Sequence, residues 1–342
     1  MKRTGFLKVL LMVLSVFVLV LVGCGSSSGN KNDDANESKG TVLLDSPLVG
    51  VTYVCEEPKD PGVVKKTDSE GRFECDKAPV TFKIGGLVLG SIDNLDKDFV
   101  IPQDILGLKR NNFTDPKLIA LLRLLQSMDD DGNISETITI TEEMSHKFDA
   151  VDEEFNADHL DVYAGKAGID VLVTEEEARG HLILSIKNTL STMPRSHDLD
   201  GKTLYMTGCT YSVSDRGVEY DAIGGIRVGP NMQGSETIVI LKFENGFVVQ
   251  MSVVGSPEDV GNNLDGAPGM YYQIGAGGFN IGPISDGGYS LLKVSKNYYL
   301  DISANDRSET LEVVSFFDTP DEARAYIQKV YSKVERTCEV TR

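Results

Sequence analysis

The residues best suited to chemistry are three oxygen-bearing side chains that alternate in one short acidic segment. Asp129, Asp131 and Asn133 stand two positions apart, with a glycine among them. This spacing matches the first, third and fifth positions of an EF-hand loop, whose side-chain oxygens bind Ca²⁺. The sixth and twelfth positions are Ile134 and Ile140, where such a loop uses glycine and a bidentate glutamate. The segment predicts Ca²⁺ as a cofactor that needs further ligands, and a solvated polar turn is the alternative.

A second chemical feature is Cys24, which follows an apolar N-terminal run. Lys2, Arg3 and Lys8 form a positive start, and residues 9–22 are apolar except for one serine. A cysteine at the end of such a run is typical of a bacterial lipoprotein signal, which is cleaved so that the cysteine is acylated, for example with palmitate. The alternative is a transmembrane anchor, which needs about 20 apolar residues. Glycine rather than aspartate follows the cysteine, as in the outer-membrane sorting pattern.

The other four cysteines fit an exported protein. They are Cys55, Cys75, Cys209 and Cys338. An even number in an oxidising compartment predicts disulfides, and four cysteines allow three connectivities. We favour Cys55 with Cys75 and Cys209 with Cys338, because each pair then closes within one predicted domain. A zinc site is not favoured, since the chain has neither a C-x-x-C motif nor paired histidines.

No group of residues predicts catalysis. The four histidines are His146, His159, His181 and His197. They are scattered, so each is expected at the surface or in packing rather than as a base. Residues 25–29 match G-x-S-x-G, but the strand and helix that a hydrolase elbow needs are missing around them. The glycine-rich Ile274–Gly282 segment reads as turns or bulges, because it is not followed by a nucleotide-binding helix.

The elements that position these residues are predicted from two hydrophobic periods, that of strands and that of helices. Residues 41–102 alternate in the manner of short strands, for example from Val49 to Cys55, and glycines punctuate them. A helix is expected after Asp115 as N-cap, with leucines at helical spacing up to the acidic segment. Another is expected over Met144–His159, and a third runs from the Thr174 capping box to about Thr192. The predicted apolar face of this third helix is Ala178, Leu182, Leu184, Ile186 and Leu190.

After residue 193 the pattern becomes β again. The eight candidate strands are Lys202–Tyr211, Gly217–Val228, Glu236–Phe243, Gly246–Val254, Met270–Ile274, Gly288–Val294, Tyr298–Ile302 and Glu309–Phe317. Short, evenly spaced strands joined by Gly, Asn and Asp turns are typical of an up-and-down barrel or a sandwich. A closing helix is expected over Asp321–Val334, with Thr319 as its cap.

Several of these motifs together resemble modules of adhesin-like or uncharacterised bacterial surface lipoproteins. The matching residues are Tyr53 and Cys55, Phe73 and Cys75, Gly85 to Gly90, Leu124 to Asn133, Thr174 to Leu182 and Gly201 to Tyr205. The last of these resembles the start of a lipocalin-like β domain. The resemblance covers most of the chain after the signal, and it implies a surface location more clearly than it implies an activity.

The predicted fold class is mainly β with a helical middle segment (α+β). It comprises a small N-terminal antiparallel sandwich, a helical connector, and a C-terminal antiparallel barrel or sandwich with a closing helix. The predicted division is a signal peptide (1–23), a flexible tether (24–40), a sandwich-like domain (41–102), a helical connector with the acidic loop (103–192) and a lipocalin-like domain (193–342).

The predicted function is that of a non-enzymatic binding or adhesion module, exported and anchored by lipid at the outer membrane or cell surface. Its partners would be the membrane, through the lipid on Cys24, and a protein. The alternative is a carrier that holds a small apolar ligand inside the C-terminal barrel. A net charge of −19 argues against nucleic acid as a partner.

Overall fold

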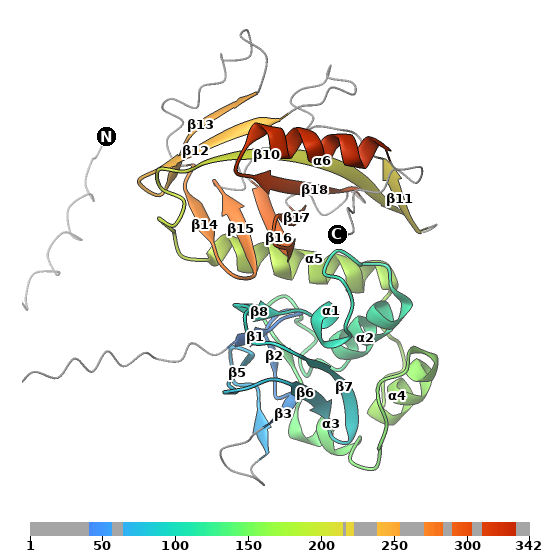
Figure 1. Cartoon of the computed structure of the whole chain (residues 1–342). Helices are drawn as coiled ribbons and strands as arrows, with labels where there is room; N and C mark the ends of the chain where they lie inside the picture. The colour runs from blue at the N-terminus through green and yellow to red at the C-terminus, as the bar shows by residue number, and fades with distance from the viewer. Residues whose placement is uncertain are drawn as a thin grey trace, which may run out of the picture. The chain divides into compact units, whose positions relative to one another are not determined.

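The computed structural model describes residues 41–56, 64–214, 217–221, 238–253, 270–282, 289–302 and 310–332. Over these residues the fold is mainly β with few helices, as predicted. A set of small, sandwich-like sheets comes first in the chain, several helices follow, and a nearly closed antiparallel sheet comes last (Figure 1).

Three small sheets form the N-terminal part. In the first, β1 (Thr41–Leu43) pairs antiparallel with β5 (Arg72–Phe73) and parallel with β8 (Phe99–Val100). In the second, β2 (Leu48–Val49) pairs parallel with β9 (Ile138–Thr139), which comes from beyond the acidic segment. The third is antiparallel and contains β4, β3, β6 and β7 in that order (Lys65–Lys66, Thr52–Cys55, Val80–Ile84 and Leu87–Ile92). The acidic segment is thus fixed to the N-terminal sheets on its far side.

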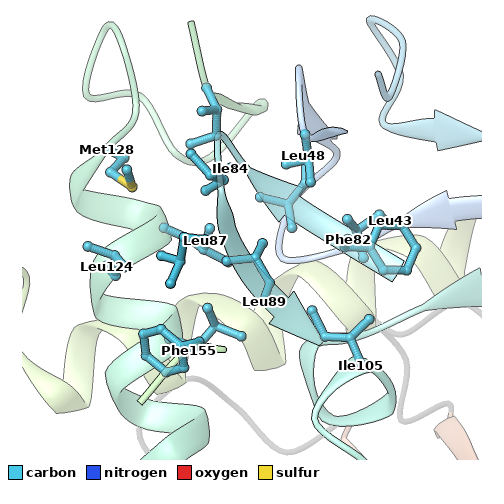
Figure 2. Close-up of a cluster of buried hydrophobic side chains, with 14 of the residues drawn as sticks. Leu43, Leu48, Phe82, Ile84, Leu87, Leu89, Ile105, Leu124, Met128 and Phe155 are labelled. Atoms are coloured by element: carbon cyan, nitrogen blue, oxygen red, sulfur yellow. The ribbon is translucent and has the colours of Figure 1, made fainter. Parts of the chain in front are cut away.

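The core of this part forms because strand residues alternate between two environments. In β6, Val80, Phe82 and Ile84 are buried while the residues between them are half-buried, as expected for a strand with one face on a core. Figure 2 shows Phe82 and Ile84 in one cluster with Leu124 and Met128, which lie at the end of the leucine-rich helix. That helix is α2 (Pro116–Ser127), with Asp115 as its predicted N-cap.

The helical segment after the acidic loop differs from the prediction. The helix expected over Met144–His159 is wrong: the structure has α3 (Glu142–His146), an irregular stretch, a 3₁₀ turn (Ala157–His159) and α4 (Leu160–Ala167). The stretch between these helices lies along β7 instead, since Val88 N donates to Glu153 O and Phe155 N donates to Val88 O. Its backbone groups are satisfied by the sheet edge, so they need no helix. Pro102–Ile105 forms the short helix α1.

The C-terminal sheet is antiparallel and nearly closed, in agreement with the predicted barrel. Its strand order is β13, β12, β10, β18, β17, β16, β15 and β14, with β11 also paired to β10. The strands are Phe247–Val253, Val239–Glu244, Thr203–Ser214, Thr310–Phe317, Tyr298–Asp301, Tyr289–Ser295, Gly278–Ile281, Tyr272–Ile274 and, for β11, Gly217–Asp221. Phe247 and Tyr271 form a bridge between the two ends of this order, and Tyr272 N donates to Gly246 O.

The two faces of the sheet pack against different partners. Side chains from eight strands meet inside it, among them Phe243, Tyr272, Phe279 and Phe316. On the outer face, Leu292 and Leu300 pack with α5 (Glu175–Thr192), and α6 (Pro320–Ser332) covers β10 and β18 (Figure 1). Alternation along each strand produces both cores, because successive side chains point to opposite faces.

Two further differences from the sequence-based expectations are local. Strand β15 was not predicted, because the glycines of this segment favour turns or bulges and leave only Phe279 and Ile281 to indicate a strand. Leu184, expected on the apolar face of α5, is 46% exposed. The rest of that predicted face is buried, namely Ala178, Leu182, Ile186 and Leu190.

Candidate functional site

The acidic segment follows the end of α2 and brings three carboxylates together. Ligand atoms of Asp129, Asp130 and Asp131 all lie within 4.8 Å of one another. The predicted ligands Asp129 and Asp131 belong to this set, and Asp130 joins them. The Oδ1 atom of Asn133, the third predicted ligand, accepts a hydrogen bond of 2.6 Å from the hydroxyl of Ser135. Such a group of carboxylates can attract a cation, and without one its members repel each other.

Asp129 is the least exposed of the three. Its Oδ1 accepts a hydrogen bond from Thr139 N at 2.8 Å, and its Oδ2 is buried with no hydrogen-bond partner among the described residues. Burial raises the pKa of its carboxyl, and the neighbouring Asp131 and Asp130 raise it further. A complete EF-hand ring is not assembled here, since Ile140 lies in the hydrophobic core and its N–H pairs with Val49 O.

A second group of polar residues lies buried next to this loop and was not predicted. Asp45 and Ser46 form a tight turn between β1 and β2, and Ser46 adopts a positive φ of 59°. The side chain of His181, on α5, reaches both: its Nδ1 is 3.2 Å from Asp45 Oδ1, and its Nε2 is 3.2 Å from Ser46 Oγ. Asp45 is completely buried and Ser46 is 4% exposed.

This buried serine, histidine and aspartate have the connectivity of a catalytic triad, but their hydrogen bonds differ from one. Ser46 Oγ donates to the carbonyl oxygen of Ile134 at 2.7 Å, and His181 Nε2 lies 2.7 Å from the same oxygen. A carbonyl only accepts, so Nε2 must carry a proton and cannot take one from Ser46. The arrangement therefore supports the loop at Ile134 and does not activate a nucleophile.

The aspartate of this group is held from a third element. Gln126, on α2, donates through Nε2 to both carboxyl oxygens of Asp45 at 3.3 and 3.1 Å, and to Ala178 O at 3.0 Å. Ser185, one turn after His181 on α5, lies 3.3 Å from Ser46 Oγ. Four segments therefore converge on one buried polar cluster: the turn after β1, the end of α2, the acidic loop and α5.

Opposing effects set the ionisation of the pair. Burial raises the pKa of Asp45, and its bonds with His181 and Gln126 offset this only in part. Burial by itself would lower the pKa of His181, but the contacts with Asp45 and the Ile134 carbonyl outweigh it, so its pKa is raised. Both shifts have the same meaning, since the folded chain holds a proton at this pair more tightly than free side chains would.

Sequence reasoning missed this cluster because its members are far apart in the chain. The separation between Asp45 and His181 is 136 residues. One local signal was present: His181 and Ser185 stand one turn apart on the helix face that carries Ala178 and Leu182, and residues at this spacing share a face. Polar residues on a buried helix face need partners, which points to a polar group opposite them.

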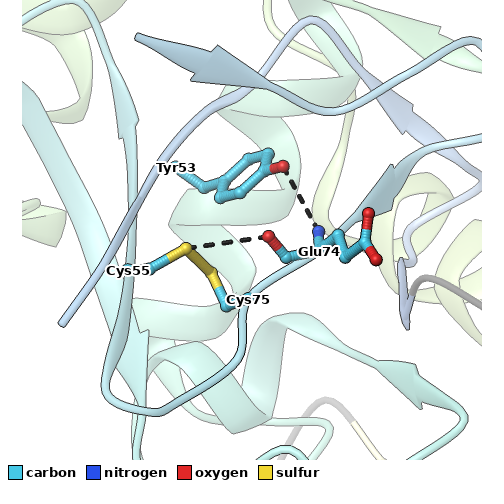
Figure 3. The surroundings of a disulfide bond; sticks show 4 residues. All are labelled: Tyr53, Cys55, Glu74 and Cys75. Carbon is cyan, nitrogen blue, oxygen red and sulfur yellow. Dashed lines mark hydrogen bonds between the residues drawn. A yellow bond between two sulfur atoms is a disulfide. The ribbon is translucent and has the colours of Figure 1, made fainter. Parts of the chain in front are cut away.

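The predicted Cys55–Cys75 disulfide is formed, between β3 and the segment after β5. Figure 3 shows Tyr53 beside it, where the Tyr53 hydroxyl accepts a hydrogen bond of 3.2 Å from Glu74 N. Cys209 lies in β10, whereas Cys338 and the lipidation residue Cys24 are outside the described residues. The pairing of Cys209 with Cys338 stays a prediction.

The three remaining histidines and the glycine-rich segment lie in different surroundings. His146, His159 and His197 are exposed, and each lies beside a carboxylate, of Asp149, Glu153 and Asp200 respectively. In the glycine-rich segment, a Cβ on Gly277 would lie 2.4 Å from the ring of Phe99, and one on Gly278 would lie 2.4 Å from Leu190. These glycines let the β14–β15 hairpin approach β8 and α5.

Comparisons with family models, with curated proteins and with solved structures found no match for this chain. None of the described helices combines the length and the apolar composition that crossing a bilayer requires. The resemblance to surface lipoproteins therefore stays an expectation from sequence motifs.

Proposed function

We propose that the protein is an exported, lipid-anchored and non-enzymatic binding module of the bacterial cell envelope. The observation that carries this proposal is the order of features at the N-terminus: a positive start, an apolar run, Cys24 and then a polar tract rich in Ser, Gly and Asn up to residue 40. Acylation of the cysteine would hold the protein at the outer membrane or cell surface, and the polar tract would act as a flexible tether.

Two features of the folded part support this proposal. The Cys55–Cys75 disulfide suits an oxidising compartment outside the cytoplasm. The buried group of Ser46, His181 and Asp45 is bonded to the Ile134 carbonyl and is not arranged to activate the serine, so it gives no support to a hydrolase. The partner would be a protein met at the cell surface, while the acidic charge of the chain disfavours nucleic acid.

The anchoring part is tested by replacing the lipidated residue. Cys24→Ala should move the protein from the membrane fraction to the soluble fraction and abolish incorporation of a palmitate analogue. Ser26→Ala, two residues away in the tether, is the matched control and should stay at the membrane with its label. Persistence of the Cys24→Ala protein in the membrane would contradict lipid anchoring.

The binding part is tested by comparing cells that carry the two variants. Cells with the Ser26→Ala protein should adhere to immobilised surface proteins more strongly than cells with Cys24→Ala. Equal adhesion of both cell types would contradict an adhesive role at the surface, even if the lipid were present.

The carrier alternative receives less support from the described barrel. The aromatic rings of Phe243, Tyr272 and Phe279 fill its interior at centroid distances of 5.0 to 6.3 Å from one another. Such spacing is that of a packed core. Native mass spectrometry of the full chain should accordingly show no co-purifying apolar ligand, and a stoichiometric ligand would revive the carrier hypothesis.

We propose Ca²⁺ as a ligand of the acidic loop in addition. The carboxylates of Asp129, Asp130 and Asp131 fit the oxygen preference of the ion, although Ca²⁺ takes about six to eight oxygens, so water or further residues must complete the shell. The buried, unpartnered Oδ2 of Asp129 is the atom that would gain most from a cation.

Removing the ion provides the test. A ligand of the folded state stabilises it by mass action, so the unfolding midpoint should be higher in Ca²⁺ than in chelator. At a Ca²⁺ concentration a hundredfold above Kd, the free energy of unfolding should increase by about 2.7 kcal/mol. Asp129→Asn should abolish the difference, and Asp170→Asn, at an exposed position, should preserve it. An identical midpoint with and without Ca²⁺ would exclude the ion.

A further inference from the structure

The acidic loop, defined here as residues 129–136, is attached to the N-terminal part at several points, and one carbonyl group among them receives two side-chain donors. The oxygen of Ile134 accepts hydrogen bonds from Ser46 Oγ and from His181 Nε2, both at 2.7 Å. A carbonyl oxygen has two lone pairs, so both bonds can form together. The donors belong to two segments that are far apart in the chain, the turn after β1 and the helix α5.

The number of protons at this site follows from the bonds. Since Nε2 of His181 donates to Ile134, the remaining question is what lies between Nδ1 and Asp45 Oδ1, which are 3.2 Å apart. One proton must lie there, because two acceptors facing each other would repel. The pair is then a charged histidine with a carboxylate or a neutral histidine with a carboxylic acid. The pair is electrically neutral in both cases.

Loss of that proton would disrupt the site. The pair would then carry one negative charge, at a place where Asp45 is completely buried and the side chain of His181 is 9% exposed. The single proton left on the imidazole could satisfy Asp45 or Ile134 but not both. Either arrangement leaves two acceptors in contact, and the charge lacks the water that would stabilise it.

The groups that face His181 give no substitute for the proton. The charged ones among the described residues are Asp45, from the turn after β1, and Asp129, from the acidic loop, and both favour a protonated histidine. The neutral ones are Ser46 and the Ile134 carbonyl, and a Ser46 hydroxyl that turned towards Nε2 would give up its own bond to Ile134. Gln126 touches Asp45 from the other side and is already bonded to it.

We propose that Asp45 and His181 form a proton-operated latch, which holds the acidic loop in place while the pair shares one proton and releases it when that proton is lost. The direction follows from linkage: a group whose proton is held more tightly in the closed state supports that state at low pH. The latch is therefore closed below about pH 6.5, the ordinary value for histidine, and opens as pH rises through the higher value of the closed state. Repulsion among the three aspartates of the loop favours its release.

Hydrogen exchange of the full chain, kept in detergent and chelator so that no cation holds the loop, measures the opening. The informative amides are those of Glu136, Ile138 and Thr139, whose N–H groups donate to Asn133 O, Pro47 O and Asp129 Oδ1. After correction for intrinsic exchange, their protection should be constant at acidic pH. At higher pH it should fall by about tenfold per pH unit, as loss of one proton requires.

Two variants separate the latch from a general effect of pH. In Asp45→Asn the amide can donate to Nδ1 and accept from Gln126, so the loop should stay protected with no dependence on pH. His146→Gln is the control and should keep the wild-type profile, because His146 is exposed and lies beside Glu142 and Asp149, away from the latch. Should Asp45→Asn not fold, the wild-type profile and the titration of His181 by NMR decide alone.

Each result has a defined meaning. Any one of three results would overturn the latch. Wild-type protection could be independent of pH, His181 could titrate at or below its ordinary pKa, or Asp45→Asn could keep the wild-type slope. Loss of loop protection at alkaline pH in wild type and in His146→Gln, together with a flat profile in Asp45→Asn, would support it.

Discussion

At the scale of single residues, the buried ion pair of Arg110 with Asp104 links the N-terminal sheets to the β14–β15 hairpin. Arg110 bonds Asp104 through Nε and Nη2, at 3.0 and 2.7 Å, and also donates to Phe99 O and Gly277 O. Both side chains are about 95% buried, with 5% and 4% exposed. Burial alone would raise the pKa of Asp104, but the bonds from Arg110 and Lys97 prevail and lower it.

Arg110→Met should therefore destabilise the fold strongly. It removes the main partner of a buried carboxylate, which typically costs about 3 to 5 kcal/mol, and Lys97 can offset part of this. Arg72→Met is the matched control, because Arg72 is 44% exposed in its pair with Asp68, and exposed pairs contribute about 0 to 1 kcal/mol. Urea unfolding measures both, and similar losses for the two variants would contradict the role given to burial.

The pair of Asp104 and Arg110 also contributes to the way the free energy of unfolding changes in acid. A carboxyl with a lowered pKa contributes stability that is present above its unfolded value of 3.8 and is lost as pH falls through the folded value. The difference in stability between wild type and Arg110→Met should thus shrink below about pH 4. A difference that stays constant into strong acid would show that Arg110 acts through packing instead.

The contacts that could be predicted from the sequence are those between residues that are close together along the chain. The Asp115 cap, the Thr174–Glu177 capping box and the pairing of Cys55 with Cys75 are contacts between near neighbours, and all three are present. The contacts of His181 with Asp45 and Ser46 join residues 135 or more positions apart, so no local pattern contains them. The predicted ligand Asn133 accepts a hydrogen bond from its neighbour Ser135, and its part in a calcium site stays a prediction.

At the scale of elements, some glycines are required by the packing of one element on another, and others are not. Gly277 and Gly278 stand where the β14–β15 hairpin touches Phe99 and Leu190, so their lack of a side chain is required by contact. Gly180, in the middle of α5, is exposed and has nothing within 4 Å of the position of a Cβ. Sequence alone cannot distinguish these cases, because both depend on which element lies opposite.

Alanine at these positions should therefore have opposite effects. Gly180→Ala should stabilise the fold by about 1 kcal/mol, because alanine restricts the unfolded chain and suits a helix. Gly277→Ala should destabilise it, since the added Cβ would lie 2.4 Å from the ring of Phe99 and displace the hairpin. Thermal unfolding of the two variants measures the signs, and a stabilising Gly277→Ala would show that the hairpin is not packed against β8.

At the scale of the whole molecule, one hydrophobic core joins regions that the sequence assigns to different domains. It contains Leu44 and Phe99 from the N-terminal sheets, Leu182 from α5, and Leu292 and Leu300 from the barrel. The described residues also belong to one compact unit. The predicted domain boundaries at 102 and 192 follow changes of periodicity, and periodicity does not report which cores are shared.

A shared core implies that the described parts unfold together. Calorimetry of the full chain should show one transition whose calorimetric and van't Hoff enthalpies agree. Leu182→Ala should move the whole transition downwards, since emptying a fully buried leucine site costs about 3 kcal/mol. Leu184→Ala, two residues along the same helix at a site 46% exposed, should move it little. If Leu182→Ala instead split the trace into two transitions and lowered only one of them, the sheets and the barrel would be independent domains, and α5 would belong to the one whose transition moved.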